Sequence, residues 1–273
     1  MTINCNQTLI DLSIPKVMGI LNITPDSFYD GGKYKNATDI LSQTEKMLKE
    51  GATFIDVGAY SSRPGAKHIS EVEELKRILP VIELLVKNFP EIIISVDTFR
   101  SKIAQETINA GAAIINDISS GNMDDKMFET VANLQVPYIL MHMLGTPQNM
   151  QKNPEYQNVT QDLITFFAKK INKLRTLKLN DIIIDTGFGF GKTIPHNFEL
   201  LKNLSLFQNL EVPILVGISR KSMLYKTLDI SAKEALNATT SANTIALLNG
   251  ANILRVHDVR EAVEAIKIVE QVK

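Results

Sequence analysis

Polar side chains recur at the points where short apolar segments of this 273-residue chain end. The segments IIISV and III are each followed by an aspartate, Asp97 and Asp185, and the segment AIIN ends on Asn116. Carboxylate and amide oxygens accept hydrogen bonds from N–H groups, and the amide also donates. Together the three side chains suit a flat heterocycle that carries several N–H groups, such as an aminopyrimidinone.

A second set of side chains offers positive charge and donors. Arg255 and His257 occur in the last apolar segment, in the sequence RVH, and Arg63 occurs in SSRPGA. Guanidinium and imidazole groups suit a phosphate group. Asn22, at the end of the first apolar segment, is a neutral oxygen ligand suited to a Mg2+ ion that keeps most of its waters. These residues predict one substrate that combines an N–H-rich heterocycle with a phosphoryl group.

The stretch DTGFGFGKT, residues 185–193, looks at first like a phosphate-binding loop. The pattern G-x-x-x-x-G-K-[ST] would need a glycine where Thr186 stands, and the dinucleotide fingerprint does not alternate its glycines strictly. We therefore expect this stretch to present Asp185 to the ligand and Lys192 to take no part. A glycine-rich turn without any ligand is the alternative.

Eight apolar segments are candidates for the strands that position these side chains. They are VMGIL (17–21), FIDV (54–57), IIISV (92–96), AIIN (113–116), YILM (138–141), IIID (182–185), ILVG (214–217) and ILRV (253–256). Most are apolar at successive positions, as strands buried on both faces are.

Helical patterns separate these segments, as in 37–50, 70–87 and 231–249. Eight alternations of strand and helix predict a single-domain (β/α)8 TIM barrel over residues 1–273, with an open doubly wound sheet as the alternative. In such a barrel the ligand site lies at the C-terminal ends of the strands. Residues 1–14 are expected to form a short hairpin that closes the bottom, and the loops 22–32 and 61–66 are expected to act as lids.

The net charge, the cysteine count and the lengths of the apolar runs argue against several classes of function. A net charge of −1 gives no electrostatic basis for binding nucleic acid or an anionic membrane. A single cysteine, Cys5, fits a reducing compartment. No apolar run approaches a membrane span and no secretory signal is visible, so we expect a cytoplasmic protein.

Eight motifs of the chain resemble, in order, those of the dihydropteroate synthase family. They run from residue 18 to 259: MGILNITPDSFYDGG, SSRPGA, SVDTFRSKIA, INDISSG, LMHMLGTPQNMQ, DTGFGFGKT, GISRKSML and RVHDV. The resemblance implies a transferase of folate biosynthesis and a sulfonamide target. Its substrates would be 6-hydroxymethyl-7,8-dihydropterin diphosphate and 4-aminobenzoate, and its products 7,8-dihydropteroate and diphosphate.

The resemblance also implies roles for individual residues. Asn22 would bind Mg2+, and the pterin would be held by Asp97, Asn116, Asp185 and Lys221. The diphosphate would be held by Arg63, Arg255 and His257. The aminobenzoate pocket would be bordered by Ser62, Pro64, Phe190, Lys221 and Ser222, with Phe28 beside it. Lys221, Arg255 and His257 are the expected catalytic residues. The family usually forms homodimers through helices near the C-terminus, and the apolar stretch 261–269 is compatible with that.

The chain departs from the family pattern at three places. Thr186 stands where proline is common, Ala59 and Tyr60 stand where a Gly-Glu pair is common, and Ser62 replaces threonine while keeping its hydroxyl. The first two departures concern loop geometry.

Two other functions share parts of this site. A methyltetrahydrofolate-binding domain of a cobalamin methyltransferase would use the same pterin contacts, but it has no diphosphate to neutralise, so Arg63, Arg255 and His257 argue against it. A Schiff-base aldolase would use Lys221. We expect no depressed pKa there, because the Ser-Arg-Lys-Ser loop is not a buried apolar wall.

Overall fold

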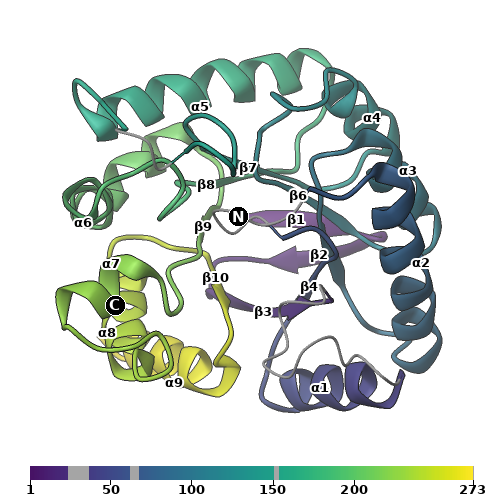
Figure 1. Cartoon of the computed structure of the whole chain (residues 1–273), viewed down its shortest axis with the longest axis horizontal. Helices are drawn as coiled ribbons and strands as arrows, with labels where there is room; N and C mark the ends of the chain where they lie inside the picture. The colour runs from purple at the N-terminus through teal and green to yellow at the C-terminus, as the bar shows by residue number, and fades with distance from the viewer. Residues whose placement is uncertain (24–36, 62–67, 151–153, 273) are drawn as a thin grey trace.

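Eight parallel strands of the chain close into a barrel, and helices surround it (Figure 1). The computed structural model describes residues 1–23, 37–61, 68–150 and 154–272. The strands are β3 (Lys16–Asn22), β4 (Phe54–Gly58), β5 (Ile94–Asp97), β6 (Ile114–Asp117), β7 (Tyr138–Met141), β8 (Ile182–Asp185), β9 (Ile214–Val216) and β10 (Ile253–Val256). They neighbour one another in chain order, and β10 pairs with β3 to close the ring. The predicted (β/α)8 barrel is confirmed.

The outer layer consists of helices that follow the strands. They are α1 (Ala37–Lys49), α2 (Glu71–Asn88), α3 (Ser101–Asn109), α4 (Met127–Leu134), α5 (Val159–Thr176), α6 (Ile194–Lys202), the 3-10 helix η1 (Leu204–Leu210), α7 (Ser222–Thr227), α8 (Leu236–Leu248) and α9 (Val259–Val269). No helix of the described residues is long and apolar enough to cross a membrane.

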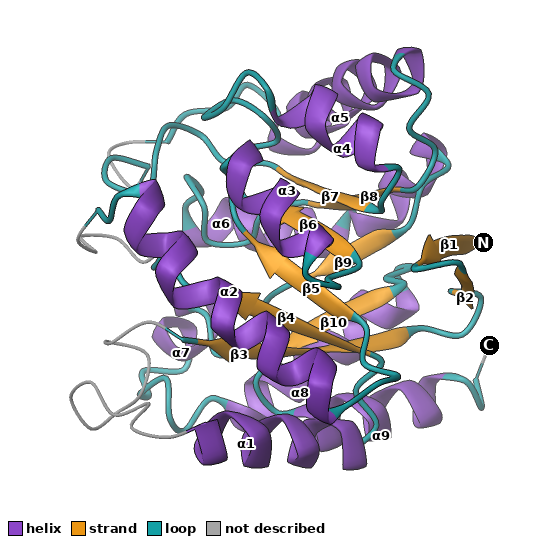
Figure 2. Ribbon diagram, turned by 90° about the vertical axis from the view of Figure 1, so that its right-hand side faces the viewer, coloured by secondary structure: helices purple, strands orange, loops and turns teal. Residues whose placement is uncertain are grey.

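The predicted N-terminal hairpin is present and closes the bottom of the barrel. It pairs β1 (Thr2–Cys5) with β2 (Thr8–Asp11), and Figure 2 shows it at the same end of the molecule as both termini. Ile3 and Leu12 pack with Met18 and Phe54 on the barrel interior. The open end of the barrel is therefore the one at which the strands end.

Alternation along the strands decides which side chains enter the barrel. Met18, Ile183 and Ile253 belong to the interior cluster, whereas their neighbours pack outward against the helices. Because side chains alternate with a period of two, the residues two and four positions further along also point inward. This parity directs Asn22, Asp97, Asn116, Asp185 and Arg255 into the barrel mouth.

One predicted helix is shorter than expected. The pattern over 231–249 yields α8 only from Leu236, because Ser231 N and Oγ donate to Glu234 in a separate turn. The carbonyls of Ala232 and Lys233 accept hydrogen bonds from Arg220 Nη1 instead of from helical N–H groups. The glycine expected after the helix is present, and Gly250 has a φ of 95°.

Candidate active site

Residues near the ends of four neighbouring strands lie in one row across the barrel mouth. In the barrel register Asn22 pairs with Gly58, Gly58 with Asp97, and Asp97 with Asn116. Gly58 has no side chain, and a Cβ there would stand 3.6 Å from both Asn22 Oδ1 and Asp97 Oδ2. The predicted metal ligand and the first predicted heterocycle ligand therefore border the same opening.

Asp185 and Arg255 border a second glycine on the other side of the barrel mouth. A Cβ at Gly217 would stand 3.7 Å from Asp185 Oδ2 and 3.9 Å from the Cβ of Arg255. Asp185 Oδ1 accepts a hydrogen bond of 2.8 Å from the backbone N–H of Gly187. This bond fixes one carboxylate oxygen and orients the other toward the opening.

Asp56, which the sequence did not single out, links the two sides of the mouth. Its side chain is fully buried, and its Oδ2 accepts from Arg255 Nε at 2.6 Å and from Asn116 Nδ2 at 3.1 Å. Arg255 Nη2 also donates to Asp97 Oδ2 at 3.2 Å. The signal in the sequence was a carboxylate inside the apolar segment FIDV, two positions before Gly58 and so on the same face of the strand.

Asp97 and Asp185 hold protons more tightly than a free aspartate does. Burial raises the pKa of Asp97 to about 7; the charge of Arg255 opposes this effect and that of Asp56 adds to it. Burial also raises the pKa of Asp185, against the opposing charge of Lys221. Both carboxylates thus lie in a poorly solvated site where a hydrogen-bonding ligand replaces water.

Lys221 lies at the N-cap of α7, beside the loop that follows β8. Its Nζ donates to the carbonyl of Phe188 and stands 4.6 Å from the centroid of the Phe190 ring. Burial lowers its pKa to about 8, although Asp185 opposes this. The expectation of an unperturbed lysine is therefore wrong, because the glycine-rich loop folds over the side chain. Ser222, the first residue of α7, is half-buried next to it.

His257 follows β10 and contacts Ser219, which follows β9. The His257 N–H donates to Ser219 Oγ at 3.3 Å, and His257 Nδ1 lies 3.0 Å from the same oxygen. A hydroxyl that donates to Nδ1 leaves the ring proton on Nε2, which is the nitrogen able to donate to an anion. Arg220, also missed by the sequence, holds this region through a bidentate pair of 2.8 and 2.9 Å with Asp258.

Lys192 is not the bystander that the sequence suggested. Its side chain is buried, and its Nζ donates to three backbone carbonyls and contacts Nδ1 of the buried His142. Burial, with the charge of Lys192, lowers the pKa of His142 to about 2, so this ring is neutral. His142 packs among aromatic rings and does not contribute a charge to the site.

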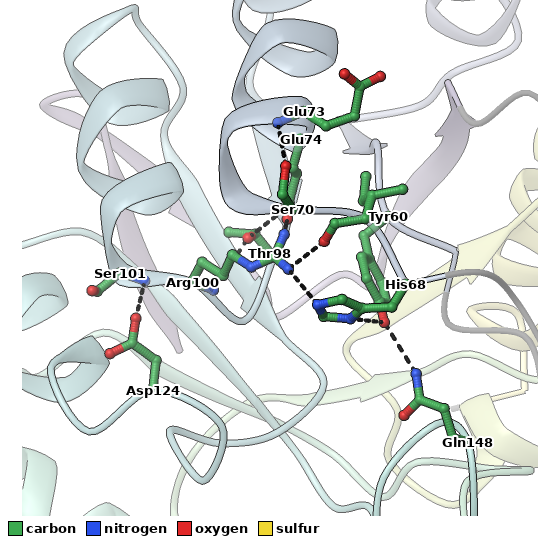
Figure 3. Close-up of polar contacts among 11 residues, drawn as sticks. Tyr60, His68, Ser70, Glu73, Glu74, Thr98, Arg100, Ser101, Asp124 and Gln148 are labelled. Atoms are coloured by element: carbon green, nitrogen blue, oxygen red, sulfur yellow. Dashed lines mark hydrogen bonds and ion pairs between the residues drawn. The ribbon is translucent and has the colours of Figure 1, made fainter.

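Tyr60, one of the departures from the family pattern, takes part in a polar network beside the mouth (Figure 3). Its hydroxyl accepts from Gln148 Nε2 at 3.2 Å and lies 3.2 Å from His68 Nδ1. Arg100, whose guanidinium stands 5.6 Å from the centroid of the Tyr60 ring, donates to the fully buried Glu74. Segments that follow three different strands thus meet at this network.

Four predicted site residues fall outside the described residues. They are Phe28, Ser62, Arg63 and Pro64, and most of the two predicted lid loops falls there with them. Of the other predicted residues, Asn22, Asp97, Asn116, Asp185 and Arg255 share the barrel mouth, Phe190, Lys221 and His257 lie on the loops around it, and Ser222 begins α7.

The donor set near Asn22 fits a hard cation only in part. Among the residues that the structure describes, no group of three or more His, Cys, Asp or Glu side chains could hold a metal. Mg2+ commonly takes one or two protein oxygens and completes its shell with waters and substrate phosphates. Asn22 Oδ1, at the edge of the opening by Gly58, fits that mode of binding.

Known proteins with the same sequence pattern are numerous. A model of the family described as "Pterin binding enzyme" matches residues 18–257. Dihydropteroate synthase of Haemophilus influenzae is 43% identical over 270 residues, covering 98% of each chain. Dihydropteroate synthase of Escherichia coli K12 is 43% identical over 265 residues, covering 96% of this chain and 93% of its own length.

Solved structures share the architecture over the same length. The Yersinia pestis dihydropteroate synthase in complex with a sulfonamide drug has a TM-score of 0.94 at 43% identity, covering 100% of this chain and 99% of its own. The Xanthomonas albilineans dihydropteroate synthase with 4-aminobenzoic acid has a TM-score of 0.92 at 35% identity, with coverages of 99% and 97%.

Proposed function

The chain belongs to the dihydropteroate synthase family of pterin-binding enzymes, and from this premise we propose how its barrel mouth joins the two substrates. The enzyme acts in folate biosynthesis and forms 7,8-dihydropteroate. The proposal concerns the residues that bind each part of the substrates and the course of the displacement.

The pterin ring lies in the barrel mouth between the two glycines, Gly58 and Gly217. Asp97 and Asp185 accept hydrogen bonds from its N–H groups, and Asn116 both accepts and donates. Lys221 donates to the ring carbonyl, with its ammonium directed by the carbonyl of Phe188. The supporting observation is that these side chains border openings left by the glycines.

The diphosphate lies above the guanidinium of Arg255 and the imidazole of His257, and the SSRPGA motif supplies Arg63 as a further cation. Two of the three guanidinium nitrogens of Arg255 donate to Asp56 and Asp97, and this fixes the plane of the group. His257 donates from Nε2. Asn22 Oδ1 would be the protein ligand of a Mg2+ ion, and such an ion would supply positive charge against the leaving group.

Displacement begins when the bond between the pterin methylene carbon and the diphosphate oxygen breaks, and its electron pair leaves with the diphosphate. The electron-rich dihydropterin stabilises the methylene cation, and the anionic Asp97 and Asp185 favour it over the neutral ground state. The aminobenzoate nitrogen then forms the C–N bond and loses a proton. Phe190 and Ser222 border its pocket.

Exclusion of water protects the cation from capture before the amine attacks. The burial of Asp56, Asn116 and Asp185 supports a poorly hydrated mouth. These carboxylates, the lysine and the arginine around one mouth are the observation that carries the proposal.

The test is an assay of diphosphate release by the purified chain. Release should require both the pterin diphosphate and 4-aminobenzoate, and chelation of divalent cations should abolish it. A methyltetrahydrofolate-binding domain would bind the pterin and release no diphosphate. Release with either substrate alone, or undiminished turnover after chelation, would contradict the proposal.

Arg255→Ala should lower kcat strongly with the diphosphate substrate and have a smaller effect on binding of a pterin that lacks the diphosphate. Arg260→Ala is the matched control, because Arg260 lies on α9 and pairs with Glu264 at the surface. Equal effects of Arg255→Ala on both ligands would remove Arg255 from the diphosphate site. Steady-state kinetics and calorimetry measure the two effects.

We further propose a homodimer in the cytoplasm. Apolar side chains are exposed on α6 and α8, at Phe198, Ile245 and Leu248, and these two helices contact each other. Much of the stretch 261–269 is instead buried against the barrel. The buried thiol of Cys5, which forms no disulfide, is compatible with a reducing compartment.

A further inference from the structure

The ammonium of Lys192 lies in a cradle of backbone carbonyls beneath the site. Its Nζ donates to the carbonyls of His142 at 3.1 Å, Gly187 at 3.0 Å and Phe190 at 3.0 Å. His142 Nδ1 lies 3.0 Å from the same nitrogen. Only 3% of Lys192 is exposed, so these contacts replace water almost completely.

The number of acceptors indicates the protonation state. Three carbonyl oxygens and His142 Nδ1 lie within 3.1 Å of Nζ, and an ammonium with three N–H donors serves more of them than a neutral amine with two. Burial lowers the pKa of Lys192, and the charge of Asp185 opposes that effect. The neutral His142 ring completes the cradle without adding a second positive charge.

The cradle joins the end of β7 to the loop that follows β8. The carbonyl of His142 belongs to the first segment, and those of Gly187 and Phe190 belong to the second. Gly187 has a φ of 68°, and a Cβ there would stand 2.0 Å from the His142 carbonyl oxygen. The two segments are therefore in close contact, and without the ammonium the carbonyls of His142 and Phe190 would lose this donor, whereas that of Gly187 would still accept from the N–H of Phe190.

The same loop holds two groups of the proposed reaction. The N–H of Gly187 donates to Asp185 Oδ1 at 2.8 Å, and the carbonyl of Phe188 accepts from Lys221 Nζ. The Phe190 ring stands 4.6 Å from Lys221 Nζ. Each of these contacts is made by a residue of the stretch 187–190. Lys192 Nζ donates to the carbonyls of the first and the last residue of that stretch.

We propose that Lys192 is a positioning residue for the condensation, because its ammonium fixes the loop that orients Asp185 and Lys221. This inference rests on the proposed function of those two residues. Lys192 itself does not touch the substrate in this proposal; it acts through the backbone of the loop.

The experiment compares Lys192→Met with Lys170→Met. Lys170 lies on α5, outside the barrel, and is a matched control because its Nζ also donates to a backbone carbonyl, that of Ser120, at 2.8 Å. Lys192→Met should lower kcat/KM for the pterin diphosphate by about tenfold or more, as expected when buried carbonyls lose their donor. Lys170→Met should leave kcat/KM within about twofold of wild type at temperatures where both variants are folded.

The alkaline limb of the pH profile separates positioning from mere stabilisation. In wild type we expect this limb to follow Lys221, whose pKa burial lowers to about 8. Because Lys192→Met displaces the Phe188 carbonyl, the limb should move by roughly half a pH unit or more. A variant that is only less stable keeps the wild-type limb.

Wild-type kcat/KM and an unchanged alkaline limb in Lys192→Met would overturn the inference. If that variant does not fold, Lys192→Gln, whose amide donates two hydrogen bonds, should fold and show a smaller loss in the same direction; wild-type behaviour there would also overturn it. Wild-type enzyme is assayed in parallel, so failure of the proposed function appears separately. Calorimetric binding of pterin diphosphate reports on Lys192 independently of turnover.

Discussion

Three carboxylates and two cations share the barrel mouth within the described part of the chain. Asp56, Asp97 and Asp185 are the carboxylates, and Arg255 and Lys221 are the cations. A fully buried Asp56 anchors Arg255, so this arginine is held in place before any ligand binds. The excess of acceptors suits an N–H-rich ring and a developing cation, which is the charge distribution that the proposed displacement needs.

Asp185→Asn should weaken binding of the pterin diphosphate by roughly 1–3 kcal/mol, the usual effect of losing a charged hydrogen bond. Asp181→Asn is the control, because Asp181 precedes the same strand at the opposite end of the barrel. Isothermal titration calorimetry measures both. An unchanged affinity in Asp185→Asn would remove this residue from the pterin site.

The pH dependence of kcat/KM should show two limbs close together. Asp97, with a pKa raised by burial to about 7, accepts from an N–H more strongly when ionised, so activity rises as pH increases through that value. Lys221, with a pKa lowered by burial to about 8, donates more strongly when protonated, so activity falls above that value. Lys221→Met should keep residual activity with the acid limb and lose the alkaline one. A profile that stays flat across both values would refute these assignments.

At the scale of elements, α2 and α3 are joined by an ion pair that the helical periodicity of each could not reveal. Glu74 Oε1 accepts from Thr98 Oγ1 at 2.7 Å, and Glu74 Oε2 pairs with Arg100 next to the network of Tyr60 (Figure 3). Burial raises the pKa of Glu74, against the effects of Thr98 and Arg100. The pair thus holds the start of α3 against α2, close to the segment on which Tyr60 lies.

Glu74→Ala should lower the free energy of unfolding by roughly 3–5 kcal/mol, because it leaves a buried guanidinium without its partner. Glu73→Ala removes the neighbouring carboxylate, which pairs with Arg77 at the helix surface, and should leave the urea midpoint nearly unchanged. Urea unfolding followed by circular dichroism compares the two. Similar midpoints for both variants would show that the buried pair does not stabilise the fold.

For the molecule as a whole, exposed apolar side chains on α6 and α8 are candidates for a contact between two copies of the chain. Ile245 and Leu248 are three positions apart on α8, so they lie on the same face of the helix, and they are 45% and 54% exposed. A face of this kind fits the interface of a homodimer.

Replacing Ile245 and Leu248 together by glutamate should shift the protein from twice the chain mass to the mass of one chain, because the charges would be buried in the interface. Val72→Glu, at an exposed apolar position on α2, should leave the mass unchanged. Sedimentation velocity measures both. A wild-type monomer at micromolar concentration would contradict the dimer.

The sequence by itself determined the barrel, because eight apolar segments alternate with amphipathic helices and the closed ring buries both faces of every strand. The segments at 138–141, 182–185 and 253–256 coincide with β7, β8 and β10. Polar residues at the strand ends indicated the mouth, since parallel strands present their carboxyl ends on one side.

Only the tertiary structure decided how these residues are joined. Asp56 reaches Arg255 across 199 positions of sequence, and Lys192 reaches His142 across 50. Which polar group neutralises or desolvates another depends on the register between strands and on the path of the loops, neither of which a local pattern contains. For that reason the sequence located the site but misjudged Lys192 and the pKa of Lys221, whose surroundings are assembled from distant segments.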